Sequence, residues 1–281
     1  MAAFRYVVAD VFTDTPLQGN GLAVFTDARG IPEDSLQPLA RELNLSETVF
    51  VYPREGDGDV KIRIFTPARE LPFAGHPVLG TAFVLAAPLQ RDVIRLETGS
   101  GVVPIQLERE GGRISFGWMS QPIPKVKPFD GDEAALLDAL GVERSELPIE
   151  LYDNGPQFVY VRLPSREAVV GLTPDFNYLA TIPVVGVDCF AGDGAKWKAR
   201  MFAPGSGVAE DPATGSAAGP LALHLARHGA IEFGDEIEIS QGAEIGRPST
   251  LFARVRGSRD AVEAVEVGGS AVVVARGEFT F

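Results

Sequence analysis

The feature that most constrains the fold of this chain is an internal repeat. Residues 70–86 (ELPFAGHPVLGTAFVLA) align with residues 210–226 (EDPATGSAAGPLALHLA) at a constant shift of 140 positions, and both copies share the pattern Glu-x-Pro-x-x-Gly. Upstream, Phe65 and Pro67 match Phe202 and Pro204 after a three-residue insertion. Helix propensity alone explains shared Ala and Leu, but not this loop pattern, so the repeat indicates two copies of one strand–loop–helix unit.

Each copy contains a helix of an unusual kind. Pro77–Ala87 and Ala217–Ala226 are apolar on nearly every face, which is typical of a helix buried on all sides. Short β-branched and aromatic runs recur through both halves and predict strands around these helices. Two more helices, Pro32–Leu43 and Asp132–Leu140, are amphipathic. The predicted fold class is therefore α+β, with two pseudo-symmetric halves, each a β-barrel-like shell of strands around a buried central helix.

The length of 281 residues suits two domains of ordinary size. We place their boundary in the proline-rich stretch at residues 120–127, so that residues 1–122 form the N-terminal barrel and residues 123–281 the C-terminal barrel. The last strand, residues 271–281, is compatible with a return to the first half.

Composition excludes several classes of function. The net charge of −13 leaves little basic surface for nucleic acid or anionic membranes. A single cysteine, Cys189, rules out an intramolecular disulfide, multi-cysteine metal sites and racemases that need two thiols. We see no secretory signal and no span long enough for a bilayer, and we expect a cytoplasmic protein.

The loop before each buried helix is a candidate anion site. Gly75 and Gly215 come directly before the two helices and are followed by His76 and Ser216. The first amides of a helix lack internal partners and carry partial positive charge, so a substrate carboxylate is the natural ligand. The alternative is that Ser216 is only an N-cap and Gly75 only a turn residue.

Two carboxylates stand out near these loops. Asp211 has no acidic counterpart in the first copy, where Leu71 occupies the aligned position, and this asymmetry predicts different roles for the two halves. Glu47 lies between a predicted helix and a predicted strand, a common place for a catalytic side chain. Alternatively, it is a solvated residue at the start of a strand.

Other motifs are weak. His224 and His228 have the i, i+4 spacing of two metal ligands, but no glutamate follows the first histidine as in zinc proteases, so we expect no metal and place His228 at the C-terminal end of the helix. No glycine-rich loop matches a nucleotide site. Cys189 fits a buried structural thiol better than a nucleophile.

Motifs along the whole chain resemble the phenazine-biosynthesis PhzF family, whose fold is shared with diaminopimelate epimerase. One departure is Gly21, where the family usually has proline after Gly-Asn. The segments that carry the resemblance are Gly19-Asn20, Ala23-Val24, Arg41–Val51, Ile62–Ala82, Tyr152–Pro156, Cys189–Gly192, Glu210–Gly229 and Gln241–Ser249.

The resemblance implies a cofactor-independent isomerase that forms homodimers and binds a small carboxylate between its halves. The expected reaction converts trans-2,3-dihydro-3-hydroxyanthranilate to an amino ketone, with Glu47 moving a proton from C3 to C1. The other open alternatives are an isomerase or epimerase for another small amino or hydroxy acid, and a non-catalytic carboxylate-binding module. The implied catalytic residues are Glu47, His76 and Asp211, and the implied substrate-binding residues are Ser46, Gly75, Thr214, Gly215 and Ser216, with no metal.

Overall fold

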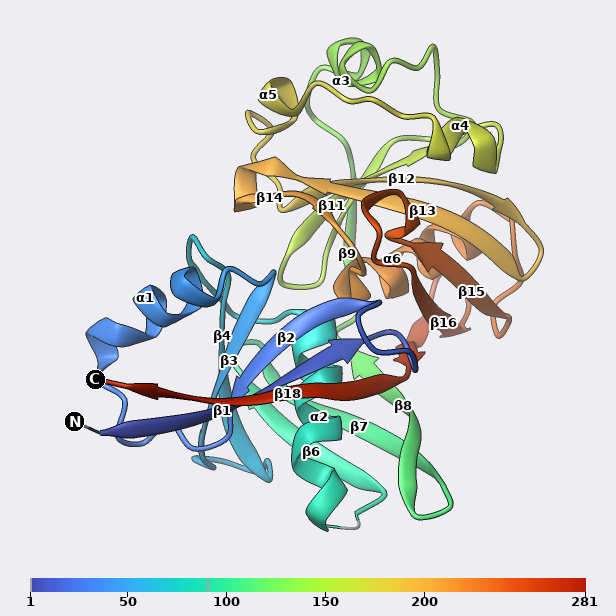
Figure 1. The fold of residues 1–281 in the computed structure, drawn as a ribbon. Helices are drawn as coiled ribbons and strands as arrows, with labels where there is room; N and C mark the ends of the chain where they lie inside the picture. Colours follow the sequence, from blue (N-terminus) through green and yellow to red (C-terminus); the bar gives the residue numbers. More distant parts are fainter. Residues whose placement is uncertain (1, 90) are drawn as a thin grey trace. The chain divides into compact units, whose positions relative to one another are not determined.

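The chain forms two compact units. A computed structural model describes residues 2–89 and 91–281, without the side chains of residues 87–89. Unit 1 runs to Ser120 and includes Gly268–Phe281, and unit 2 comprises Gln121–Val267 (Figure 1). No helix among the described residues is long and apolar enough to cross a lipid bilayer.

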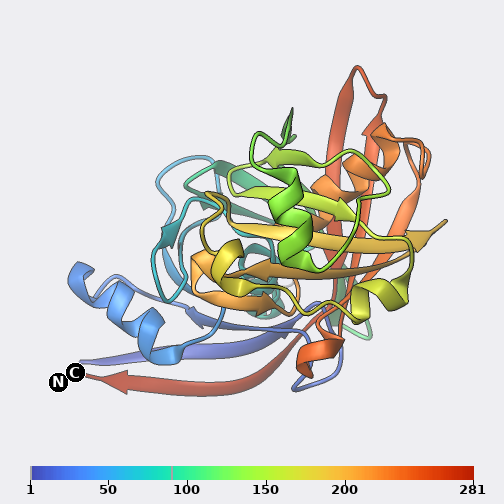
Figure 2. The same cartoon turned by 90° about the horizontal axis from the view of Figure 1, so that it is seen from above.

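Unit 1 is a shell of strands around one helix. The helix α2 (Gly75–Leu89) contacts six of the surrounding strands, and all of its described side chains except Val84 and Leu85 are buried. The first and last strands pair along the edge of this shell and bring the two termini together (Figures 1 and 2). The other elements are β1 (Ala3–Val11), β2 (Asn20–Phe25), α1 (Glu33–Leu43), β3 (Glu47–Pro53), β4 (Val60–Phe65), β5 (Glu70–Leu71), β6 (Val93–Thr98), β7 (Gly101–Glu110), β8 (Arg113–Gln121) and β18 (Ala271–Thr280).

Unit 2 has the same plan around α6 (Gly215–Arg227), whose residues are buried from Gly215 to Ala226. Three helices, α3 (Glu133–Leu140), α4 (Arg166–Val170) and α5 (Phe176–Leu179), pack on the outer face of its sheet, and α4 and α5 lie between β11 and β12 in the chain as α1 lies between β2 and β3. Its strands are β9 (Lys125–Pro128), β10 (Glu150–Asp153), β11 (Gln157–Arg162), β12 (Gly186–Asp193), β13 (Lys196–Ala203), β14 (Val208–Asp211), β15 (Glu236–Gln241), β16 (Ser249–Gly257) and β17 (Val262–Gly269).

Strand pairing repeats between the units. In unit 1 the order β1–β2–β3–β4 is antiparallel, parallel, antiparallel, and β4 then pairs with β5 antiparallel and with β6 parallel. In unit 2 the order β10–β11–β12–β13 follows the same directions, and β13 pairs with β14 and β15 in the same way. The duplication predicted from sequence is therefore present in the topology.

The shared loop glutamate has the same role in both units. Arg63 Nη2 lies 2.7 Å from Glu70 Oε2 across β4 and β5, and Arg200 Nη2 lies 2.7 Å from Glu210 Oε2 across β13 and β14. Each pair joins the two strands that lead into a buried helix. The second pair is buried and the first is partly exposed, so water screens the first pair more strongly.

Apolar clusters attach the outer helices. Leu36 and Leu39 of α1 pack in a cluster with Phe25, Phe50 and Phe65, in which the Phe25 and Phe50 rings stack at 5.0 Å. The amphipathic pattern of α1 thus meets an aromatic surface of the sheet.

The helix boundaries differ from the sequence prediction. α6 begins at Gly215 and α2 at Gly75, both earlier than expected. Ser216 is therefore the second residue of α6 and is not its N-cap, which is Thr214. His228 is the C-cap of α6, as predicted.

Three side chains bind carbonyl groups of the first turn of α6. Pro220 lies inside this helix and has no N–H to donate to the carbonyl of Ser216. Asn154 Nδ2 donates to that carbonyl at 2.9 Å. The carbonyls of Gly215 and Ala217 accept from Gln121 Nε2 at 2.7 Å and from the Tyr160 hydroxyl at 2.8 Å, respectively. These bonds hold the start of α6 in place although its regular hydrogen bonding is interrupted.

Replacing Asn154 by alanine should lower the free energy of unfolding by ~1–3 kcal/mol, because the buried carbonyl of Ser216 loses its donor. In an Asn154→Ala, Pro220→Ala double variant, residue 220 regains an N–H for that carbonyl, so part of the loss should return. Urea unfolding followed by the fluorescence of Trp197, in a Trp118→Phe background, reports this double-mutant cycle. Strictly additive effects of the two substitutions would contradict the pairing.

Candidate functional site

Glu47 and His76 lie side by side in unit 1. Glu47 is the first residue of β3, and His76 is the second residue of α2. The distance from Glu47 Oε2 to His76 Nδ1 is 3.4 Å, and Asn20 Nδ2 lies 3.2 Å from the same nitrogen. The side chains of Glu47 and His76 are 14% and 3% exposed, so this carboxylate has little contact with water.

His76 is a neutral imidazole. Burial lowers the pKa of His76 to about 3, although a hydrogen bond with the backbone of Gly21 acts in the opposite direction. Glu47 thus faces a neutral imidazole and not a cation.

Strand pairing fixes where Glu47 points. β2 and β3 are parallel, with Leu22 opposite Glu47. Asn20 precedes Leu22 by two residues and therefore points to the same face of β2. Ser46 comes directly before Glu47 and is half-buried, and Gly75 opens α2. The start of two strands and the start of the buried helix thus meet at one place in unit 1.

In unit 2 a chain of hydrogen bonds orients Asp211, which ends β14 and is 9% exposed. The Thr214 hydroxyl donates to Asp211 Oδ2 at 2.6 Å. Gln241 Nε2 donates to the Asp211 carbonyl at 2.8 Å and to Thr214 Oγ1 at 3.0 Å. Thr214 is therefore both donor and acceptor, which fixes the direction of its hydroxyl proton toward Asp211.

Gly242 makes this arrangement possible. Its φ is 78°, and a Cβ atom there would lie 2.5 Å from the Pro212 carbonyl oxygen and 2.4 Å from that of Arg247. Only glycine fits so close to both backbones. The Gln241-Gly242 pair can therefore pack against the turn that carries Asp211.

The N-terminal end of α6 offers amides for an anion. The side chain of the N-cap residue Thr214 makes no capping hydrogen bond, because its hydroxyl donates to Asp211. Gly215 and Ser216 form the start of the helix, where backbone N–H groups and the helix dipole favour negative charge. The backbone N–H groups at this end of α6 are therefore suited to bind a carboxylate.

The structure thus gathers the predicted residues into one group in each unit. Ser46, Glu47, Gly75 and His76 belong to unit 1, and Asp211, Thr214, Gly215 and Ser216 to unit 2. Among the described residues, no cluster of potential metal ligands includes Glu47, His76 or Asp211. No function was predicted from the sequence for Asn20, Gln121, Asn154 or Gln241, although all but Gln121 lie in segments that carry the family resemblance.

Comparisons with known proteins place the chain in a family, and the matches cover almost all of its length. The family model for phenazine biosynthesis-like proteins (PhzC-PhzF) matches residues 9–277. The chain is 52% identical over 273 residues to trans-2,3-dihydro-3-hydroxyanthranilate isomerase of Pseudomonas aeruginosa, which covers 97% of this chain and 98% of that protein. The enzyme of the same name from Pseudomonas fluorescens is 51% identical over the same share of both chains.

Solved structures share the architecture. The PhzF-family phenazine biosynthesis protein of Bacillus anthracis matches with a TM-score of 0.86 and 26% identity over 100% of both chains. A hydroxyproline epimerase from Agrobacterium vitis matches with a TM-score of 0.67 over 98% of this chain and 92% of its own, at 13% identity, a likeness of fold alone. The predicted α+β fold of two similar halves is confirmed, and the chain belongs to the phenazine biosynthesis-like PhzF family.

Proposed function

We propose that this protein is an isomerase that converts trans-2,3-dihydro-3-hydroxyanthranilate to an amino ketone in phenazine biosynthesis. The observation that carries the proposal is the Glu47 carboxylate, which is shielded from water, begins a rigid strand and lies 3.4 Å from a buried, neutral His76. The 52% identity to the Pseudomonas aeruginosa isomerase over almost the whole chain supports the choice of substrate.

In the proposed reaction Glu47 removes the proton from C3, the carbon that bears the hydroxyl group. The electron pair of the broken C–H bond shifts through the ring diene, and the protonated Glu47 returns a proton to C1. The resulting enol tautomerises to the ketone, so no oxidant, reductant or added group is needed. A carboxylate is a weak base toward carbon, and its poor hydration in this site favours the transfer.

The substrate carboxylate is attached to C1 and is conjugated with the diene. Negative charge that leaves C3 therefore collects partly on its oxygens in the transition state. Backbone amides at the start of α6, at Gly215 and Ser216, would stabilise this charge without a metal ion. We assign to Asp211 and His76 the binding of the amino and hydroxyl groups, with Ser46, Gly75 and Thr214 in support.

The reaction as proposed uses neither metal nor organic cofactor. By analogy with the family, we also propose that the protein acts as a homodimer in the cytoplasm. The homodimer and the cytoplasmic location are independent of the proton transfer at Glu47.

The variant Glu47→Gln should reduce kcat by ~100- to 10,000-fold, because the amide keeps the shape of the side chain but cannot accept the proton. The loss of diene absorbance in the ultraviolet, with purified protein and trans-2,3-dihydro-3-hydroxyanthranilate, measures this rate. The matched control is Glu42→Gln, an exposed glutamate on α1, which should turn over like wild type. Undiminished turnover by Glu47→Gln would rule out this residue as the base, and no turnover by wild type would rule out the substrate.

Thr214→Val should lower kcat by up to ~100-fold, because Asp211 loses the hydroxyl that orients it. Thr214→Ser keeps this hydroxyl and should retain most of the activity. Steady-state kinetics of the two variants separate orientation of Asp211 from simple loss of volume. Equal activity of the valine and serine variants would show that the hydrogen bond does not matter for turnover.

A further inference from the structure

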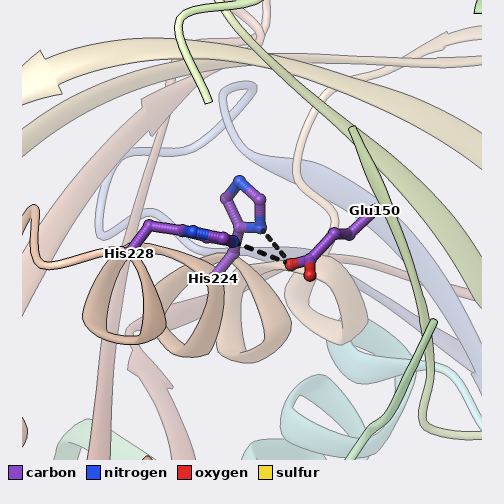
Figure 3. A group of neighbouring side chains, drawn as sticks. All are labelled: Glu150, His224 and His228. Atoms are coloured by element: carbon purple, nitrogen blue, oxygen red, sulfur yellow. Dashed lines mark hydrogen bonds and ion pairs between the residues drawn. The ribbon is translucent and has the colours of Figure 1, made fainter. Parts of the chain in front are cut away.

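A cluster of potential metal ligands lies at the C-terminal end of α6. Figure 3 shows His224 and His228 on neighbouring turns of this helix, both hydrogen-bonded to Glu150 of β10. Glu150 Oε2 lies 3.2 Å from His224 Nδ1 and 2.9 Å from His228 Nε2. The three ligand atoms all lie within 4.8 Å of one another.

These separations suit a small divalent cation. A tetrahedral Zn²⁺ site with bonds of about 2.0–2.1 Å places its ligand atoms about 3.3 Å apart. The two measured contacts to Glu150 are close to this value, so small side-chain rotations would admit an ion. The Tyr152 hydroxyl lies 2.8 Å from the same Glu150 oxygen and 3.1 Å from His224 Nδ1, and it can support the site or hold a bound water.

Hydrogen bonds and burial set the charge states of Glu150 and His224. Burial alone would raise the pKa of Glu150, but hydrogen bonds from His224, His228 and Tyr152 outweigh it and lower this pKa to about 2. Burial lowers the pKa of His224, although its bond to Glu150 partly opposes this. A metal ion would displace the protons on the two ring nitrogens that hydrogen-bond to the Glu150 carboxylate.

Two of the three ligands are partly exposed, so an ion can reach the cluster. A nearby arginine carries a positive charge that opposes its binding. Glu150 and His228 are 14% and 15% exposed, whereas His224 is fully buried against the rings of Tyr160 and Phe190. Arg227 Nη2 lies 3.7 Å from Glu150 Oε1, and its positive charge acts against a cation.

We propose that Glu150, His224 and His228 form a binding site for a transition-metal dication such as Zn²⁺. No third ligand lies next to the two histidines in the sequence. Glu150 of β10 supplies it, 74 residues before His224 and 78 residues before His228. His224 and His228 follow Gly215 by 9 and 13 residues, which corresponds to ~14–20 Å along the helix axis. The ion thus ties α6 to β10 and stabilises unit 2, and it takes no part in the reaction proposed above.

The test uses tag-free protein freed of metal with EDTA and then titrated with ZnSO₄ by calorimetry at about pH 7.5. The chain has only three histidines, of which His76 is buried elsewhere, so background binding is low. We expect one Zn²⁺ per chain and a Zn²⁺-dependent rise in Tm.

The variants His228→Gln and Glu150→Gln should each weaken binding at least ~10-fold and abolish the rise in Tm, whereas Arg227→Gln should tighten binding because an opposing charge is removed. Glu146→Gln, a carboxylate paired with Arg144 outside the cluster, is the matched control and should bind like wild type. Circular dichroism verifies that each variant is folded. Absence of saturable binding by wild type, or equal binding by wild type and both ligand variants, would overturn the proposal.

Discussion

The burial of one apolar helix inside each shell of strands is the constraint on which the rest of the structure depends. A helix without a polar face is stable only where other elements cover it on all sides, and α2 and α6 are covered in this way. Their ends are consequently fixed with respect to the strands around them. His76 and Ser216 therefore occupy defined positions although both lie next to loops.

Burial also makes hydrogen-bond partners valuable for the polar groups that enter the apolar interior. The break that Pro220 makes in α6 is compensated by Asn154, and the carbonyls beside it are bound by Gln121 and Tyr160. At the other end of α6, His224 shares its proton with Glu150. The two ends of α6 thus differ: the side chain of the N-cap Thr214 makes no capping hydrogen bond, whereas both histidines at the other end bind Glu150.

Much of this could be predicted from the sequence, because the repeat and the apolar helices are local signals. The start of β3 at Glu47 follows from the end of a helix and the start of a β-branched run. What could not be predicted depends on contacts between distant residues. Glu150 meets His224 only because β10 lies beside α6, and Gln241 supports Asp211 only because β15 ends near β14. The short helices α4 and α5 carry too few residues for a periodic pattern, although Ser165 and Asp175 cap them.

In the proposed reaction the single carboxyl group of Glu47 carries the proton from C3 to C1. The most direct measurement uses substrate labelled with deuterium at C3, converted by wild-type protein in ordinary water and analysed by NMR. A shielded carboxyl group that returns the atom it removed should leave part of the deuterium at C1 of the product. Complete replacement of the label by solvent hydrogen at C1 would contradict the claim.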